Sequence, residues 1–241
     1  MSIGTLEGLD LSIEYPELTG KRVLVTGVAG AVGVDVVRAF AEAGTRLIVQ
    51  APEDNAECRA LAEIIAPYAM EVQLQPGAFT DADAMLRFAR EAAQRFGGLD
   101  VVANIAHCPE PPARADEAAI EALVAETLAM PVLATRVAIN RMRTMLAEGS
   151  IVNIVAGSRG ATGRGRLLAA IARASLAAFT RAEAEAASAY DIRVNAIVPA
   201  DGLAGDVRAL EGSADIASLT MHLASGRSHA LSGLAFEAWC G

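Results

Sequence analysis

Short apolar runs alternate with segments of helical period along almost the whole chain. The runs cover residues 21–27, 46–50, 70–75, 99–106, 150–156, 192–199 and 234–239, and helices are expected near 31–44, 55–66, 81–96, 116–147, 164–179 and 215–224. Continuously apolar strands are typical of a parallel sheet covered on both faces, because each crossover returns the chain to the same edge. The alternation therefore predicts an α/β fold, a doubly wound parallel sheet of about seven strands with helices on both faces.

No Pro/Ser-rich linker and no internal repeat divides the chain, so we expect a single domain over residues 18–241 after an N-terminal extension over 1–17. Pro131 falls inside the expected helix 116–147. Because proline lacks the N–H that a helix interior needs, we expect that helix to be interrupted or kinked there.

The composition excludes several classes of function. The net charge of −9 and the absence of a basic cluster argue against a nucleic-acid-binding surface. The apolar runs are shorter than the roughly 18 residues of a membrane span, and the start lacks the pattern of a secretory signal, so we expect a cytoplasmic protein with no membrane segment. Cys58, Cys108 and Cys240 are odd in number and far apart, which predicts reduced thiols and no metal site.

A glycine-rich turn, "TGVAGAVG", separates the first strand from the first helix. In such a turn the backbone N–H groups of a helix N-terminus can approach a pyrophosphate. Gly27, Gly30, Ala31, Val32 and Gly33 are therefore the candidate cofactor-binding residues. The alternative is that the glycines only allow the helix and strand to pack closely.

The end of the second strand lacks the acid that a dinucleotide site uses for the adenosine ribose, about 20 residues after the glycines. Gln50 and Ala51 occupy that place, and Glu53 and Asp54 follow in the loop. Either acid could reach back to the site, or both could be solvated loop charges.

With these segments placed, residues 18–241 resemble the short-chain dehydrogenase/reductase family. "LTGKRVLVTGVAGAVG" is similar to its Thr-Gly-x-x-x-Gly-x-Gly segment, with Ala31 at the middle glycine and Gly30 one place early. "GGLDVVANIA" is similar to its strand ending in Asn-Asn-Ala-Gly, with Asn104 retained and His107 at the last glycine. "GSIVNIVAG", "IRVNAIVPA" and "DIASLTMHLASGRSHALSG" match its later segments. The resemblance implies a Rossmann-like fold in which the turn and Asn104 bind NAD or NADP.

The resemblance also implies oxidation of alcohols or reduction of carbonyls by a Ser/Tyr/Lys/Asn set. Ala156 stands at the serine, Ala169 at the tyrosine, Arg173 at the lysine and Thr127 at the asparagine. A methyl group cannot transfer a proton, so the usual catalytic set is absent and we assign no catalytic residue.

We considered three side chains as substitutes for that set. His107 follows the fourth strand at the carboxyl edge, where doubly wound folds bind ligands. Ser158 lies two residues after the serine position, whereas Tyr190 lies about five helical turns beyond the tyrosine position and should be too distant. His107 and Ser158 could equally be ordinary loop residues.

Other positions that the resemblance assigns to cofactor binding are also altered. Ala78 replaces the acid that faces adenine, and Ala204 replaces a threonine that faces the nicotinamide amide. A loop with Arg159, Arg164 and Arg166 could bind an anionic ligand such as an acyl-CoA or a partner protein, or could simply be a solvated basic loop.

Three hypotheses of function follow. The first is a non-catalytic structural or regulatory subunit that forms a homo- or hetero-oligomer with similar subunits, including an active homologue. The expected interface is formed by helices 116–147 and 167–189, where the small residues Ala170, Ala174 and Ala177 permit close packing. The second is an NAD(P)-dependent oxidoreductase that uses His107, Ser158 and Arg173. The third is a nucleotide or acyl-CoA sensor without turnover.

Overall fold

The computed structural model describes residues 15–79, 81–156, 163–199 and 210–239. Its strands are β1 (Arg22–Thr26), β2 (Arg46–Ala51), β3 (Glu71–Pro76), β4 (Val101–His107), β5 (Gly149–Ala156), β6 (Ile192–Pro199), β7 (Leu210–Glu211) and β8 (Ala235–Trp239). Its helices are α1 (Gly30–Glu42), α2 (Ala56–Ile65), α3 (Ala82–Arg95), α4 (Glu117–Thr144), α5 (Gly163–Ala187) and α6 (Ser213–Ala224), with short 3-10 turns at Pro16–Leu18, Ser188–Tyr190 and Gly226–Ser228. The alternation of strands and helices is as predicted.

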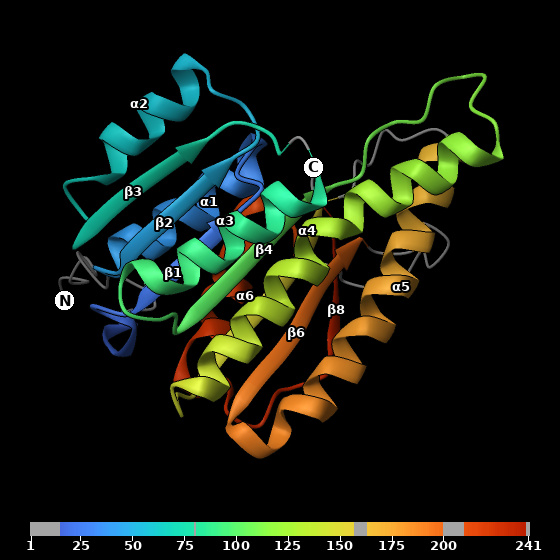
Figure 1. The fold of residues 1–241 in the computed structure, drawn as a ribbon. Helices are drawn as coiled ribbons and strands as arrows, with labels where there is room; N and C mark the ends of the chain where they lie inside the picture. The colour runs from blue at the N-terminus through green and yellow to red at the C-terminus, as the bar shows by residue number, and fades with distance from the viewer. Residues whose placement is uncertain (1–14, 80, 157–162, 200–209, 240–241) are drawn as a thin grey trace, which may run out of the picture.

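The strands form one parallel sheet in the order β3-β2-β1-β4-β5-β6-β8-β7 (Figure 1). The sheet has eight strands rather than about seven, because the two-residue β7 is too short to leave a periodic pattern in the sequence. The chain runs outward from β1 to β2 and β3, then returns to place β4 on the other side of β1. The strand order therefore reverses between β1 and β4, the place where doubly wound sheets bind ligands.

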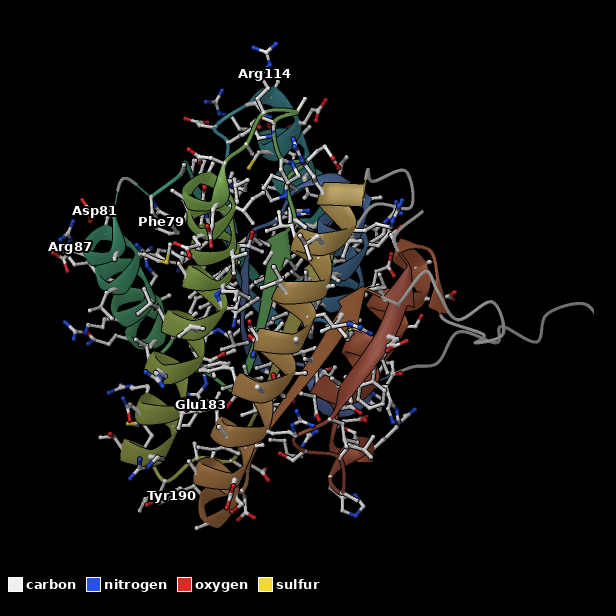
Figure 2. The ribbon with its side chains drawn as sticks, turned by 90° about the vertical axis from the view of Figure 1, so that its right-hand side faces the viewer. Phe79, Asp81, Arg87, Arg114, Glu183 and Tyr190 are labelled. Carbon is white, nitrogen blue, oxygen red and sulfur yellow. The ribbon has the colours of Figure 1, made fainter. Side chains whose placement is uncertain are left out.

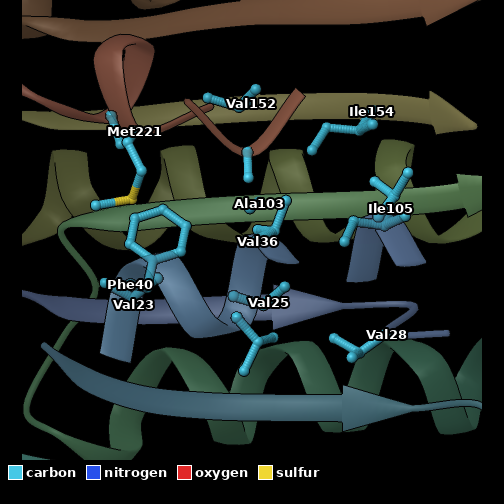
Figure 3. Close-up of a cluster of buried hydrophobic side chains, with 14 of the residues drawn as sticks. Val23, Val25, Val28, Val36, Phe40, Ala103, Ile105, Val152, Ile154 and Met221 are labelled. Carbon is cyan, nitrogen blue, oxygen red and sulfur yellow. The ribbon is translucent and has the colours of Figure 1, made fainter. Parts of the chain in front are cut away.

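Helices cover both faces of the sheet and give the molecule three layers. In Figure 1, α3, α4 and α5 lie in front of the sheet, and α1 and α6 lie behind it. One core cluster joins the sheet to α1 and α6, and Figure 3 shows Val36 and Phe40 of α1 against Val25, Ala103 and Met221. Two further clusters join the opposite face of the sheet to α3, α4 and α5.

Helix starts agree with the sequence because polar side chains mark them. Asn55, Asp81 and Asp116 each accept a hydrogen bond from the backbone N–H three residues on, at 2.7–2.9 Å, and so satisfy a donor that the first turn leaves free. Tyr15 and Leu18 are buried in the core with α1. The part of the N-terminal extension that the structure describes, from residue 15, therefore packs against the domain, and the division at residue 18 stays a prediction.

α4 runs without a break through Pro131, so of the two outcomes expected there the interruption was wrong, and the kink stays a prediction. Proline removes a single backbone donor, and packing of Ala134, Ala138 and Met142 against the sheet side holds the helix together beyond it. By length and composition alone α4 could also cross a membrane, with one third of its most apolar stretch buried inside the protein. Here it packs against β4 between α3 and α5 (Figure 1).

Candidate active site

Two glycines of the turn serve close packing. Gly27 has φ +70°, and a Cβ there would lie 1.8 Å from the carbonyl oxygen of Ile105 on β4. At Gly33 a Cβ would lie 3.0 Å from the Cα of Val28. The packing interpretation of these two glycines is therefore supported by the contacts themselves, whether or not a ligand binds.

The third glycine lies at the open start of α1. Gly30 has φ +59°, and no atom lies within 4 Å of the place that its Cβ would take. Ala29 provides no side-chain cap, Ala31 is exposed, and the Val32 side chain is in the core. The first-turn N–H groups of α1 thus have no side-chain acceptor in the cap, a geometry that fits a pyrophosphate.

The end of β2 provides an amide in place of a carboxylate. Gln50 is 3% exposed; its Oε1 accepts a hydrogen bond from Gly27 N at 2.8 Å, and its Nε2 donates to Gly77 O at 3.2 Å. Ala51 beside it is buried. Gln50 therefore fixes the backbone of the glycine turn, a role that sequence reasoning missed although a polar residue ending an apolar strand was a signal for it.

The two acids after β2 have partners of their own. Glu53 accepts a hydrogen bond from Asn55 Nδ2 at 2.9 Å, and Asp54 forms an ion pair with Arg59. Ala78, at the place of the adenine-facing acid, exposes only a methyl group. Neither acid reaches the glycine turn, so the adenosine side of a dinucleotide finds no carboxylate among these residues.

Asn104 lies inside the sheet, not at its edge. Its side chain is fully buried: Oδ1 accepts from Thr26 Oγ1 at 2.9 Å, and Nδ2 donates to Asn153 Oδ1 at 2.8 Å and to Thr135 Oγ1 at 3.4 Å. These bonds join β1, β4, β5 and α4. The side chain predicted to bind the cofactor is thus engaged in linking strands.

His107 ends β4 beside the glycine turn. Its Nε2 lies 3.1 Å from the carbonyl oxygen of Gly27, and because a carbonyl only accepts, Nε2 carries the proton of this bond. The imidazole is exposed. Of the substitute side chains considered above that lie in the described residues, His107 is at the carboxyl ends of β1 and β4 and Tyr190 is not.

At the four positions of the usual catalytic set, two side chains are alanines and the other two are bonded to neighbouring groups of the protein. Ala156 ends β5 and is buried, and Ala169 is partly exposed on α5. Thr127 donates its hydroxyl proton to Leu123 O at 2.7 Å within α4. Arg173 Nη1 lies 3.0 Å from Glu237 Oε1 on β8, a partner that the sequence did not reveal although Glu237 is the single charge in an apolar strand.

Cys108 is a further group near these positions that sequence reasoning passed over. Its backbone N–H donates to Ala156 O at 3.2 Å, and its side chain packs on the cluster of α5 and β6. Burial raises the pKa of the thiol to about 11, so it is protonated at neutral pH and is a poor nucleophile. It does not replace the missing acid/base.

Tyr190 is far from the crevice, as predicted. It lies two residues before β6, at the opposite edge of the sheet, and its hydroxyl accepts a hydrogen bond from Arg143 at 3.1 Å. Figure 2 shows Tyr190 at one end of the α4–α5 layer and Arg114, in the loop before α4, at the other. Arg164 donates to the carbonyls of Pro112 and Ala113 in that same loop. Ser158, Arg159 and Ala204 lie outside the described residues.

The outward face of α5 carries small and apolar side chains. Ala174 is exposed, Ala170 and Ala177 are partly exposed, and Leu167 and Ile171 also reach solvent. On α4 the neighbouring Arg136 pairs with Glu183 of α5 at 2.9 Å. The face on which we predicted an interface is thus present and uncovered in the single chain.

Comparison with known proteins identifies the family. A family model described as "short chain dehydrogenase" matches residues 21–207. L-fucose dehydrogenase of Rattus norvegicus is 30% identical over 185 residues, which cover 75% of this chain and 66% of the rat protein. A short chain dehydrogenase from Mycobacterium smegmatis has a TM-score of 0.78 with 24% identity, over 93% of each chain. The structure titled an NADH-dependent reductase A1-R′ complexed with NAD has a TM-score of 0.73 with 19% identity, over 93% of this chain and 97% of its own.

A parallel sheet with its crevice between β1 and β4, opened by a glycine turn, defines a Rossmann-like protein. The chain belongs to the short-chain dehydrogenase/reductase family. The match spans just under two thirds of the rat protein's length. The family generally binds NAD(P) and its members commonly form oligomers.

The described residues fit this cofactor only in part. The start of α1 suits the pyrophosphate, but Gln50 and Ala51 replace the ribose acid, and His107 contacts the turn from the other side. On α5 the place of the proton-transferring tyrosine holds Ala169.

Proposed function

We propose that this protein does not perform the family's usual alcohol–carbonyl reaction and serves as a structural or regulatory subunit. One observation supports this most strongly: Ala169 stands on α5 where the mechanism needs a phenol. General acid/base catalysis typically contributes 10²- to 10⁴-fold, and a methyl group contributes none of it. Arg173, in the place of the lysine, is paired with Glu237 on β8.

The uncovered face of α4 and α5 supports association with a similar subunit. Leu167 and Ile171 are 55% and 36% exposed beside the small residues Ala170 and Ala174. Apolar side chains beside small ones allow two helices to approach closely and bury that surface. The partner on this proposal is a second copy of this chain or an active homologue.

The relatives favour a second candidate, an active NAD(P)-dependent oxidoreductase. The rat relative is named an L-fucose dehydrogenase. On this alternative His107 would be the proton-transferring group, since its imidazole is exposed at the crevice. The third candidate, a nucleotide or acyl-CoA sensor, is supported by the open start of α1.

Binding and turnover separate these candidates. The purified protein is titrated with NADH and NADPH by nicotinamide fluorescence and assayed with NAD or NADP on L-fucose and a panel of sugar and secondary alcohols. Our proposal expects turnover at background. Measurable turnover that disappears in His107→Ala would refute it and establish the second candidate. Tight cofactor binding without turnover would favour the sensor, whereas weak binding without turnover agrees with the subunit role.

The interface is tested by one pair of variants. Ala174→Glu places a charge on the outward face of α5, whereas Ala60→Glu places the same charge at an exposed position of α2. We expect Ala174→Glu to shift the oligomer to monomer in analytical ultracentrifugation and Ala60→Glu to leave it unchanged. Equal behaviour of the two variants, or a monomeric parent protein in isolation and in its native host, would contradict the subunit role.

A further inference from the structure

The His107 side chain lies across the place where this fold binds its ligand. The β1–β4 register pairs Thr26 with Asn104, so Gly27 is level with Ile105 and His107 stands two residues further along β4. From there the imidazole reaches back to the Gly27 carbonyl at 3.1 Å. The contact thus bridges the carboxyl ends of the two strands at which the sheet order reverses, the place where doubly wound folds bind ligands.

With the His107 contact, both backbone polar groups of Gly27 are engaged. Gly27 N–H already donates to Gln50 Oε1 at 2.8 Å, and Gly27 O accepts from His107. A Cβ at Gly27 would meet the backbone of Ile105, so only glycine allows the turn to approach β4 this closely. The carbonyl of Gly27, beside the open start of α1, is therefore already engaged by the protein's own imidazole.

We propose that His107 is an internal plug of the dinucleotide crevice, and that it lowers affinity for the ribose-pyrophosphate portion of an adenine dinucleotide. This proposal rests on the proposed function and deepens it. The absence of the acid/base residues is one reason for the loss of the usual reaction, and weak binding of the cofactor is a second. Opening the crevice requires the ring to rotate away and to give up its hydrogen bond. Removing the ring should therefore raise affinity by roughly three- to tenfold, the factor that one net hydrogen bond represents.

Three substitutions at this position separate the volume of the ring from its hydrogen bond. His107→Gly and His107→Ala remove both, and His107→Phe keeps an aromatic ring without the donor. His229→Ala is the matched control, since His229 is also exposed but follows α6 at the opposite edge of the sheet. The readout is the Kd for NADH and for NADPH from nicotinamide fluorescence, with far-UV circular dichroism and a melting curve to confirm that each variant is folded.

We expect His107→Gly, His107→Ala and His107→Phe, none of which has this hydrogen bond to give up, to bind three- to tenfold more tightly than the parent, and His229→Ala not to. Adding Ala31→Asp to His107→Ala should abolish the gain, because a carboxylate at the start of α1 repels the pyrophosphate; Asp is well tolerated there. Gly33→Asp would place a carboxylate in the same helix turn, but it is a poorer test of pyrophosphate binding, because its Cβ would collide with Val28 and disturb the fold.

Weaker binding in folded His107→Ala would overturn the proposal and make His107 a binding residue. Unchanged binding in both small variants would overturn it as well, because the ring would then not be the obstacle. Turnover is scored separately: activity of the parent protein would refute the proposed function, whereas the plug is decided by the Kd values alone.

Discussion

At the junction of β1 and β4, specific contacts fix Gly27, Asn104 and Asp100, whereas small side chains occupy the acid/base positions of β5 and α5. Gly27 lies against the Ile105 carbonyl, Asn104 bonds to β1 and β5, and Asp100 pairs with Arg22. At the other junction Ala156 and Ala169 make no polar side-chain contact, because they have no polar side-chain atom. The first junction is built into the sheet and the second is not.

This difference explains why the glycine turn is a weak sign of cofactor binding in this chain. Two of its three glycines are required for packing alone, so the turn would persist in a protein that had lost the cofactor. At the acid/base positions Ala156 and Ala169 make no polar side-chain contact, so we expect these positions to change at a smaller cost to the fold. If this is correct, substitutions at the β1–β4 junction should cost far more stability than substitutions at the β5–α5 junction.

The largest effect is expected for Gly27→Ala. The substitution combines a positive φ with a Cβ placed 1.8 Å from Ile105 O, so the backbone itself must shift. We expect a loss of about 3 kcal/mol or more in the free energy of unfolding, or no soluble protein. Gly30→Ala is the control: it has a similar φ and open space, and should cost only about 1–2 kcal/mol. Equal costs in urea unfolding would contradict the packing role of Gly27.

Asn104→Ala should have the next largest effect. It leaves the fully buried Thr26 hydroxyl without its acceptor, and it removes one of the two donors to Asn153 Oδ1, to which Thr135 Oγ1 also donates at 3.1 Å. Unpaired buried polar groups cost about 1–3 kcal/mol, which should appear in the free energy of unfolding. Asn140→Ala, at an exposed position of α4, should change it by less than about 0.5 kcal/mol. A neutral Asn104→Ala would mean that the buried bonds do not hold the junction.

Most of the fold prediction rested on local sequence patterns. The features that it missed are contacts between residues distant in the sequence. Hydrophobic period and the caps Asn55, Asp81 and Asp116 are local signals, and they placed the strands and helices. The partner of Gly27 is 23 residues away, and that of Arg173 is 64 residues away. No local pattern encodes such pairs, which become visible only once the sheet brings them together.

The location of the site could be predicted from the sequence, but the contacts of its side chains could not. The strand-turn-helix pattern located the crevice, and the alanines at 156 and 169 followed from counting along the family resemblance. The contact of His107 with Gly27 could not be derived, since it depends on the register of β1 with β4. Asn104 was expected at the cofactor because the resemblance gives a position and not a direction for its side chain.

The ion pair at the start of the same two strands predicts a dependence on pH. Burial of the Asp100 carboxyl raises its pKa, but the bonds from Arg22, at 2.6–2.9 Å, lower it by more, so the net pKa lies below the usual 3.8. A depressed pKa means that the pair stabilises the fold above pH 3.8 and that this contribution is lost as the pH falls through the folded-state value.

Asp100→Asn should therefore be less stable than the parent by about 1 kcal/mol at pH 7, a value typical of a partly exposed pair. The difference should shrink as the pH falls below about 4, since the parent loses the same interaction by protonation. Urea unfolding of both proteins between pH 7 and pH 3 measures this. A difference that stays constant over that range would contradict the assignment to the ionised carboxylate.

The smallest effect is expected at the β5–α5 end, for the pair of Arg173 with Glu237. The side chains are 23% and 39% exposed, and exposed ion pairs contribute about 0–1 kcal/mol. Arg173 makes further interactions, so the pair is isolated by a double-mutant cycle of Arg173→Met, Glu237→Gln and the combination, read out as free energies of unfolding. A coupling energy above about 2 kcal/mol would mean that side-chain contacts stabilise this junction as much as the β1–β4 junction, which would remove the contrast between them. A value below about 1 kcal/mol would mean that the pair adds little to the stability of the fold, as the contrast between the two junctions requires.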